Sequence, residues 1–355
     1  MNKLIDAIDQ VIEENNLPHE WSKEISAELK QLKHKKESKK RVDLRSYPFV
    51  TIDGKDAKDF DDAVFCKEES NGFMLQVAIA DVADIVKQGT ELDFEALKRG
   101  TSIYFPKKVI PMLPEEISNN LCSLVPREDR NVLVCKIIFN KEGVINSYEF
   151  NEAIINSNKR FTYNEVEFLL QDKEINISSK ILQSIIALKK LTKKLLKERF
   201  KRNALEIDSS EPVLKFNNKD GISEISVPKR LFAHQMIEEA MISANICAAK
   251  FIKKHLGFGV YRVHEEPESL KIENLKKFFS LKGLSSKSFL DTLELINGFI
   301  SHINKNEENK MLNILILQSL KRAQYSTKEI GHFGLQLKEY SHFTSPIRRY
   351  PDLIS

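Results

Sequence analysis

Acidic side chains crowd one short segment of the chain. Five aspartates fall between positions 53 and 62, and only two lysines lie among them. The aspartates are Asp53, Asp56, Asp59, Asp61 and Asp62. Like charges so close together raise the free energy unless a cation lies between them. The segment is therefore a candidate cation site.

The spacing allows several of these carboxylates to face one point. If residues 59–64 are extended, Asp59 and Asp61 point to the same side, because side chains in a strand alternate with a period of two. Gly54 lets the chain turn, so Asp53 can approach them. Carboxylate oxygens are the ligands that Mg²⁺ and Mn²⁺ prefer, and a pair of such ions can stabilise the attacking and leaving oxygens of a phosphodiester displacement.

Two other interpretations of the segment stay open at this point. A helix–loop–helix calcium loop requires a second Asp or Asn ligand two residues after the first, and Lys55 stands in that place. A plain acidic turn without a bound ion agrees with the composition alone. The other motifs of the chain have to decide between these alternatives.

The aspartates lie at the start of a β-rich segment that follows a helical one. Apolar residues at helical spacing predict helices within 3–36, with a break at Pro18. The charged run from Lys33 to Arg41 is typical of a linker. Runs of β-branched and aromatic residues at 49–52, 73–80 and 131–139 then predict a sheet.

Long helices are predicted after the sheet, within 160–203, 231–255 and 311–323. The first of these regions carries a row of basic side chains over an apolar stripe. They are Lys189, Lys190, Lys193, Lys194, Lys197, Arg199, Lys201 and Arg202. This row is either a solvated helix face or an RNA-tracking surface. The pattern as a whole predicts an α+β fold with a mixed or antiparallel β-sheet core flanked by long helices.

The composition limits the class of protein. With 355 residues, 41% of them hydrophobic, the chain can bury a large core. A net charge of +4 excludes a polycation that coats nucleic acid over its whole surface. No apolar run is long enough for a bilayer span or a secretory signal, so we expect a cytoplasmic protein without a membrane partner. The four cysteines lack zinc-ligand spacing, which predicts buried reduced thiols.

Several motifs, in a fixed order, resemble one family. The segment from Thr51 to Val64 is similar to the signature of the ribonuclease II and ribonuclease R family, whose catalytic unit is the RNB domain. Later segments agree with the same family in the same order. They are Gly100 to Pro106 with Ile110 to Pro114 and Leu121 to Leu124, then Ile237 to Ile246, Gly331 to Gly334, and His342 to Asp352. Residues 261–264 and 321–325 look closer to the ribonuclease R branch.

The resemblance implies a function and a metal site. It implies hydrolysis of single-stranded RNA from the 3′ end, with release of nucleoside 5′-monophosphates. By position, Asp53, Asp59, Asp61 and Asp62 hold Mg²⁺, with Mn²⁺ as an alternative, and Asp61 is the residue most directly tied to the chemistry. Residues 47–355 would form the catalytic domain, and residues 1–46 a helical lead-in and charged linker.

The resemblance also assigns residues that contact RNA. Tyr104 and Tyr163 match tyrosines that stack on bases, Tyr163 at the 3′-terminal nucleotide near the cleavage point. Arg348 matches a phosphate-contacting arginine, whose planar fork can stabilise charge in the transition state. Arg349 either shares this role or pairs with a carboxylate. Glu238 either lies near the site or forms a structural ion pair.

Three histidines stand in the family motifs without metal-ligand spacing. They are His264, His332 and His342. We expect each to make structural hydrogen bonds rather than to act in catalysis.

The family's architecture includes parts that this chain does not show. Cold-shock barrels precede the catalytic domain and an oligonucleotide-binding barrel follows it, and the chain ends at Ser355 where family members continue into further helices. We therefore expect a C-terminally incomplete domain of marginal stability, or one that a partner chain completes. The leading hypothesis is an exoribonuclease. The alternatives are a truncated, inactive RNA-binding fragment and a relic that does not fold.

Overall fold

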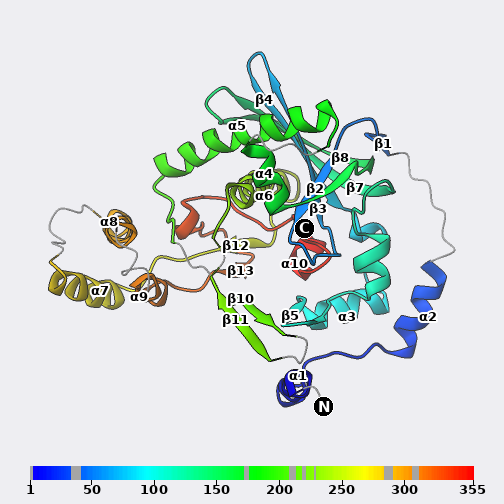
Figure 1. The fold of residues 1–355 in the computed structure, drawn as a ribbon, viewed down its shortest axis with the longest axis horizontal. Coiled ribbons are helices and arrows are strands. Elements are labelled where there is room, and N and C mark those ends of the chain that lie inside the picture. Colours follow the sequence, from blue (N-terminus) through cyan, green and yellow to red (C-terminus); the bar gives the residue numbers. More distant parts are fainter. Residues whose placement is uncertain are drawn as a thin grey trace.

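A computed structural model describes residues 3–32, 41–171, 176–207, 213–217, 221–227, 229–283, 291–305 and 312–355. At its centre lies a seven-stranded mixed sheet in the order β1-β8-β7-β4-β3-β2-β9 (Figure 1). These strands are β1 Val42–Asp43, β2 Val50–Asp53, β3 Asp62–Glu69, β4 Gly72–Ala80, β7 Asp129–Asn140, β8 Ile145–Asn156 and β9 Lys159–Thr162. Neighbours are antiparallel except at the two edges, where β1 runs parallel to β8 and β9 parallel to β2.

Both faces of the central strands are covered, which explains their continuous apolar sequence. All nine residues of β4 are buried. Because side chains alternate, Leu75 and Val77 pack on one face against helices α5 and α6, whereas Met74 and Ala78 pack on the other against α2 and α3. The sheet is thus the middle layer of three.

Helices build the outer layers and a smaller lobe beside them (Figure 1). On the two faces of the sheet lie α2 Lys23–Leu32, α3 Glu91–Arg99, α4 Tyr163–Leu170, α5 Ser179–Lys201 and α6 Phe232–Leu256. The smaller lobe has its own apolar core and consists of α7 Ser269–Leu281, α8 Thr292–Asn304 and α9 Asn313–Ser319. The chain begins with α1 Lys3–Glu14, and α10 Tyr350–Leu353 lies close to its end.

The described residues also form three two-stranded units and three short helical turns. The hairpins are β5 Ile103–Phe105 with β6 Lys108–Ile110, and β10 Val213–Phe216 with β11 Ile222–Ser226. β12 Tyr261–Val263 pairs with β13 Gln324–Ser326. The turns are η1 Val82–Asp84, η2 Glu116–Leu121 and η5 Phe333–Leu335.

The predicted fold class, a mixed or antiparallel sheet flanked by long helices, is confirmed. Two local predictions are wrong in part. The region predicted helical from residue 160 opens with strand β9, because parallel pairing with β2 supplies its backbone partners. The last predicted helix is shorter than 311–323: α9 ends at Ser319, and Met311 lies outside the described residues.

Of the charged run predicted as a linker, only Arg41 lies within the described residues. Residues 33–40 lie outside the described part of the chain. Arg41 does not behave as a linker residue, because its side chain is buried and pairs with Asp81 at 2.6 Å. All four cysteines are buried and free, as predicted. Within the described ranges, none of the helices combines the length and the apolar character needed to span a bilayer.

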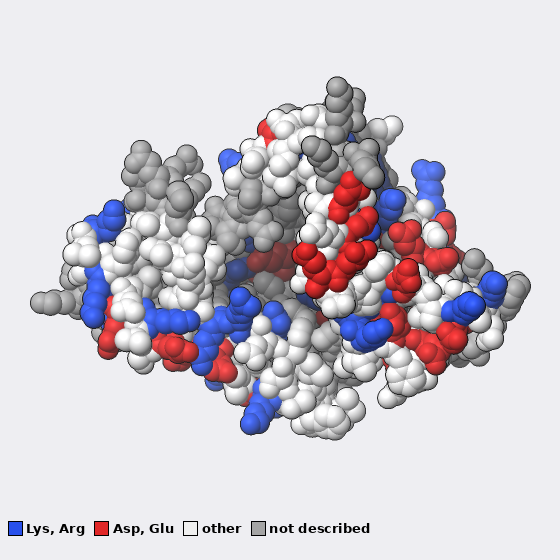
Figure 2. Space-filling model, turned by 90° about the horizontal axis from the view of Figure 1, so that it is seen from below, with Lys and Arg blue, Asp and Glu red and all other residues white. Residues whose placement is uncertain are grey.

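Surface charge is mixed, as the small net charge predicts. On the face drawn in Figure 2, the coloured Lys and Arg side chains are scattered among Asp and Glu groups and form no continuous basic area. On α5, Lys190 pairs with Glu68 and Lys201 with Glu198. Exposed pairs of this kind contribute little to stability, and they already engage part of the basic row.

Candidate active site

The aspartate segment forms the connection between two neighbouring strands. β2 ends at Asp53 and β3 begins at Asp62, so the residues between them lie on an irregular loop. Oδ1 of Asp53 accepts the N–H of Gly54 at 2.6 Å, where the chain leaves the strand. The prediction that residues 59–64 are extended is therefore correct as a regular strand only from Asp62 onward.

Side chains from other elements fix the shape of this loop. The Ser123 hydroxyl accepts the N–H of Phe60 at 3.0 Å and donates to the carbonyl of Lys58 at 2.6 Å. Arg160, on β9, donates to the carbonyls of residues 54 and 55. The loop therefore takes its conformation from tertiary contacts and not from strand pairing.

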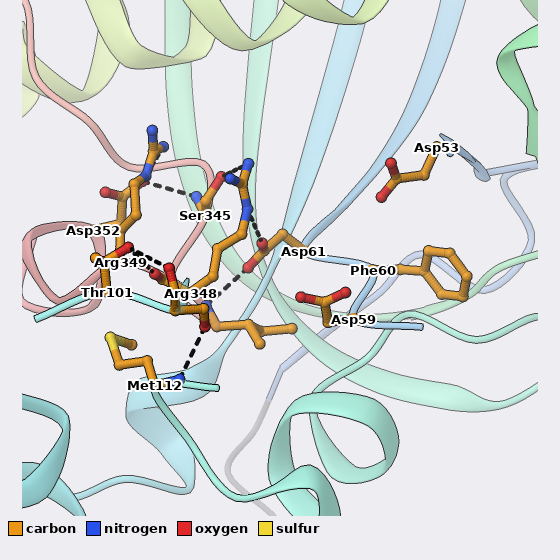
Figure 3. A network of polar contacts seen from close by, with 12 residues as sticks. Asp53, Asp59, Phe60, Asp61, Thr101, Met112, Ser345, Arg348, Arg349 and Asp352 are labelled. Atoms are coloured by element: carbon orange, nitrogen blue, oxygen red, sulfur yellow. Dashed lines mark hydrogen bonds and ion pairs between the residues drawn. The ribbon is translucent and has the colours of Figure 1, made fainter. Parts of the chain in front are cut away.

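Asp61 connects the loop to the C-terminal motif (Figure 3). Its side chain is almost fully buried. Oδ1 accepts the N–H of Ile347 at 2.8 Å, and Oδ2 accepts Nε of Arg348 at 3.2 Å. Burial raises the pKa of Asp61 well above its usual value, and the Arg348 charge and the Ile347 N–H oppose this shift only in part. Two motifs nearly 290 positions apart thus meet in one contact.

The other aspartates lie close enough to disturb one another's protonation. Burial, and then the charge of Asp53, raises the pKa of Asp62 to about 7. Burial also raises the pKa of Asp53, opposed by the Gly54 N–H and reinforced by Asp59. The Asp59 carboxylate accepts a hydrogen bond from the Tyr104 hydroxyl at 3.1 Å.

A cleft of about 960 Å³ joins these residues. Its lining includes all four predicted metal ligands together with Tyr104 and Arg348. Lysines lie around them at positions 55, 58, 107 and 108. Tyr104 is 54% exposed where it lines the cleft. Residues that were predicted from separate motifs therefore line one cleft.

The four carboxylates do not converge on a single point. Within the described ranges, no three His, Cys, Asp or Glu side chains lie close enough to form a metal cage. The expectation that three or four aspartates converge on one point is therefore wrong for this structure. The Asp61 carboxylate is turned toward Ile347 and Arg348 instead. The donor set still suits a hard divalent cation: it is all carboxylate oxygen, and its raised pKa values reflect burial and repulsion that a cation relieves.

Tyr163 is held at the edge of the same region. β9 pairs with β2 so that Thr162 faces Asp53, and Tyr163 follows directly as the first residue of α4. Thr162 caps this helix through a reciprocal capping box with Glu165. The Tyr163 ring stacks on His234 of α6, with ring centroids 4.0 Å apart and planes at 23°. The sequence did not single out His234, because its contact with Tyr163 joins two helices and leaves no local signal.

The two adjacent arginines have different partners. Arg348 contacts Asp61 and donates from Nη2 to the Ser345 hydroxyl at 2.9 Å, with 44% of its side chain exposed. Arg349 donates to the buried carboxylate of Asp352 at 2.6 Å. Of the two roles left open for Arg349, the structure thus shows the pairing with a carboxylate.

Glu238 lies away from the cleft lining and forms ion pairs. It accepts from Arg199 at 2.7 Å and also pairs with Arg230. Burial alone would raise the pKa of Glu238, but hydrogen bonding to Arg199 and the charges of both arginines lower it overall. The ion-pair alternative is therefore the one that the structure shows.

The three motif histidines make the structural hydrogen bonds expected of them. Nδ1 of His264 accepts the N–H of Gly334 at 3.0 Å, and its Nε2 lies 2.9 Å from the Lys321 carbonyl. Nδ1 of His332 caps η5 by accepting the N–H of Leu335. Nδ1 of His342 lies 2.7 Å from the Tyr325 hydroxyl.

Curated proteins are similar in sequence to nearly the whole of this chain. Ribonuclease R of Vibrio parahaemolyticus is 41% identical over 350 residues, which cover 97% of this chain and 42% of the relative. Ribonuclease R of Escherichia coli K12 is 40% identical over 358 residues, which cover 98% of this chain and 44% of the relative. The chain thus spans less than half the length of these relatives.

Solved structures are similar to this chain in fold. Mycoplasma genitalium RNase R, in complex with ribose methylated single-stranded RNA, superposes with a TM-score of 0.91 at 32% identity, covering 98% of this chain and 55% of that chain. Yeast Ssd1, described as a pseudonuclease, has a TM-score of 0.71 at 20% identity and shares the fold alone. Residues 41–355 match the RNB domain. This match, together with the aspartate cleft, shows that the chain belongs to the RNB domain family.

Proposed function

We propose that this chain is the catalytic part of a metal-dependent exoribonuclease that shortens single-stranded RNA from its 3′ end. The observation that carries the proposal is the contact of buried Asp61 with Ile347 and Arg348. This contact brings the acidic loop and the Arg348 guanidinium into one cleft. The names of the relatives and the RNA-bound structural neighbour support the same activity.

The aspartates suit the charge that a phosphodiester hydrolysis requires. Asp53, Asp59, Asp61 and Asp62 would hold Mg²⁺, with Mn²⁺ as an alternative. When bound, the ion supplies stabilisation of charge on the phosphate oxygens. Arg348 is held by Asp61 and Ser345 while its guanidinium is partly open to the cleft, so it can bind a phosphate oxygen by charge-assisted hydrogen bonds.

The aromatic residues suit a substrate of any sequence. Tyr104 exposes its ring in the cleft, and Tyr163 stacks on His234 beside Asp53. Base stacking accepts all four bases, because every base has a π-face. Tyr163 would hold the 3′-terminal base, so that hydrolysis removes one nucleoside 5′-monophosphate at a time.

A second candidate function is RNA binding without turnover. The fold is shared with a protein described as a pseudonuclease, and the chain spans less than half of its curated relatives. A partner chain or domain that completes the unit belongs to this alternative. The two functions differ in one observable, which is metal-dependent shortening of RNA.

The test is incubation of the purified chain with a 5′-labelled single-stranded oligoribonucleotide, with Mg²⁺ or with a chelator. We expect progressive 3′ shortening to short 5′-labelled products with Mg²⁺ and none with the chelator. The variant Asp61→Asn removes one carboxylate charge and should lose turnover while RNA affinity stays within about twofold, because one metal ligand is lost and the groove is kept.

The matched control is Asp56→Asn, which changes an exposed aspartate that lines the same cleft but is not among the proposed metal ligands. It should cleave at the wild-type rate. Binding without shortening by the wild-type chain would favour the second candidate function. Equal turnover by Asp61→Asn and the wild type would contradict the assigned site.

A further inference from the structure

The β5–β6 hairpin forms one wall of the cleft. Tyr104 and Val109 lie opposite each other in its two strands, and both line the cleft. The Tyr104 hydroxyl donates to Asp59 at 3.1 Å. Among the described residues, the two strands of this hairpin pair only with each other. Because an isolated two-stranded hairpin is marginally stable, other contacts must hold Tyr104 in place.

The C-terminal motif holds the root of the hairpin. The N–H of Ser102 donates to the Arg348 carbonyl at 3.0 Å, and the Ser102 hydroxyl accepts the N–H of Met112 at 2.9 Å. Ser102 and Met112 lie just outside the strands, on either side of them. These hydrogen bonds leave the position of the strands to side-chain packing.

The side of the hairpin away from Tyr104 packs on helix α1. Side chains alternate along a strand, so Ile103 and its partner Ile110 turn to the side opposite Tyr104. Ile110 packs with Ile8 and Ile12 of α1, and Ile103 joins the same cluster. Figure 1 shows α1 next to β5, apart from the helices that cover the sheet. One side of the hairpin therefore meets α1, and the other faces the cleft.

The apolar face of α1 serves this contact. Leu4, Ile8 and Ile12 recur every four residues, as on one face of a helix. Among the described residues, their cluster is separate from those of the sheet and of the smaller lobe. On the same helix, Asp9 pairs with Lys108 of β6 at 2.5 Å. The match to the RNB domain begins at residue 41, so α1 lies outside it. Burial of this face therefore stabilises the hairpin rather than the sheet.

We propose that α1 is part of the RNA-binding unit, in which Ile8, Asp9 and Ile12 are positioning residues. Through the hairpin, they hold Tyr104 beside Asp59. The proposal rests on the proposed function, in which Tyr104 stacks on a base. A ring that is fixed before the base arrives binds more tightly, because ordering a mobile hairpin on binding costs conformational entropy. Detachment of α1 should therefore weaken RNA binding although no residue that touches RNA is changed.

The test is the affinity for a fluorescein-labelled single-stranded oligoribonucleotide, measured by anisotropy in chelator. Ile12→Asp introduces a charge that cannot stay buried against Ile110. The helix should detach, and Kd should rise roughly five- to a hundredfold, as for the loss of one base stack. Ile12→Leu keeps the apolar volume and should bind like the wild type.

The matched control is Val11→Asp, which adds the same charge one position earlier on α1. Val11 is 42% exposed and lies outside the cluster with the hairpin. Val11→Asp should change Kd by less than about twofold, as surface substitutions usually do. An equal rise in Kd for Val11→Asp and Ile12→Asp would overturn the proposal.

A double-mutant cycle with Tyr104→Ala distinguishes positioning from a general loss of stability. Once the ring is absent, α1 has no ring to position, so Ile12→Asp should change Kd by less than about twofold in the Tyr104→Ala background. If instead the two single effects multiply, α1 does not act through Tyr104 and the proposal is wrong.

Hydrogen exchange, followed by mass spectrometry, tests the hold of α1 on the hairpin without RNA. Ile12→Asp should speed the exchange of the amides of 103–110 and leave those of β4 protected, because the hairpin can open without the sheet. Unchanged exchange in 103–110 contradicts the proposal even where the wild type cleaves RNA. A wild type that fails to shorten RNA with Mg²⁺ contradicts the proposed function, whereas faster exchange and weaker binding by Ile12→Asp still support positioning by α1.

Discussion

Two residues of the C-terminal motif are neighbours in sequence but have different partners. Arg348 and Arg349 are adjacent, yet the first contacts Asp61 in the cleft and the second pairs with buried Asp352 (Figure 3). Their side chains leave the backbone in different directions at the start of α10. The same type of substitution should therefore have different effects at the two positions.

We expect Arg348→Lys to lower kcat by about a hundredfold or more, because an ammonium cannot reproduce the planar fork on a phosphate. Thermal stability should change little, since the side chain is partly exposed. The measurement is oligoribonucleotide turnover beside a thermal melt.

The paired substitution is Arg349→Met, which leaves the Asp352 carboxylate buried without its partner. We expect a loss of about 2–4 kcal/mol in the free energy of unfolding and a kcat within about twofold of the wild type at temperatures where the variant is folded. A large kcat loss without destabilisation would assign Arg349 to phosphate binding instead.

Asp62 provides a test of the charge crowding. Its pKa is raised to about 7, so the free energy of unfolding falls as the pH rises from the unfolded pKa of about 3.9 to about 7, and the full loss is present above pH 7. In chelator at pH 8, Asp62→Asn should raise the free energy of unfolding by about 1–3 kcal/mol, because the neutral amide avoids both burial of charge and repulsion from Asp53. Mg²⁺ should stabilise the wild type more than the variant in denaturant titrations. Equal responses to Mg²⁺ would remove Asp62 from the ligand set.

At the scale of elements, helix starts determine where functional side chains point. α4 begins at Tyr163 directly after the Thr162 cap, so the cap and the residue proposed to stack on a base are neighbours. α5 begins after a comparable cap, Ser178, that lies away from the cleft. Substitutions at the two caps therefore distinguish the effect of a cap on stability from its effect on the position of Tyr163.

Thr162→Ala and Ser178→Ala should each lower the free energy of unfolding by about 1 kcal/mol, the usual cost of losing a cap. Only Thr162→Ala should also raise KM for RNA, because Tyr163 moves with the first turn. Chemical denaturation and kinetics measure the two effects. An unchanged KM in Thr162→Ala would show that stacking on His234 alone fixes Tyr163.

Across the whole molecule, partly buried histidines couple folding to pH. Burial lowers the pKa of His332 to about 4 and that of His342 to about 3. A histidine with a lowered pKa in the folded state stabilises the fold above the unfolded pKa of about 6.5. This contribution is lost as the pH falls from there toward the folded value.

His332→Asn isolates that contribution, because asparagine can keep the acceptor that caps η5. Relative to this variant, the wild type should lose about 1.4 kcal/mol of unfolding free energy per pH unit between about pH 6.5 and 4. A constant difference between wild type and His332→Asn at all pH values would contradict the prediction.

Local patterns in the sequence predicted strands β2, β4 and β7 of the sheet, the long helix α6 and six of the residues that line the cleft. Strand alternation and helical spacing are properties of short segments, and Asp53, Asp59, Asp61, Asp62, Tyr104 and Arg348 could be named from motifs. These features need no knowledge of distant contacts.

Only the tertiary structure decided how those residues are used. The backbone N–H of Ile347 that binds Asp61, the ring of His234 beneath Tyr163 and the approach of Phe216 to Lys107 each join segments distant in sequence. The strand that replaced the start of a predicted helix depends on β2 as its partner. Backbone donors, ring contacts and strand pairing are set by packing, because local spacing carries no information about which distant segments meet.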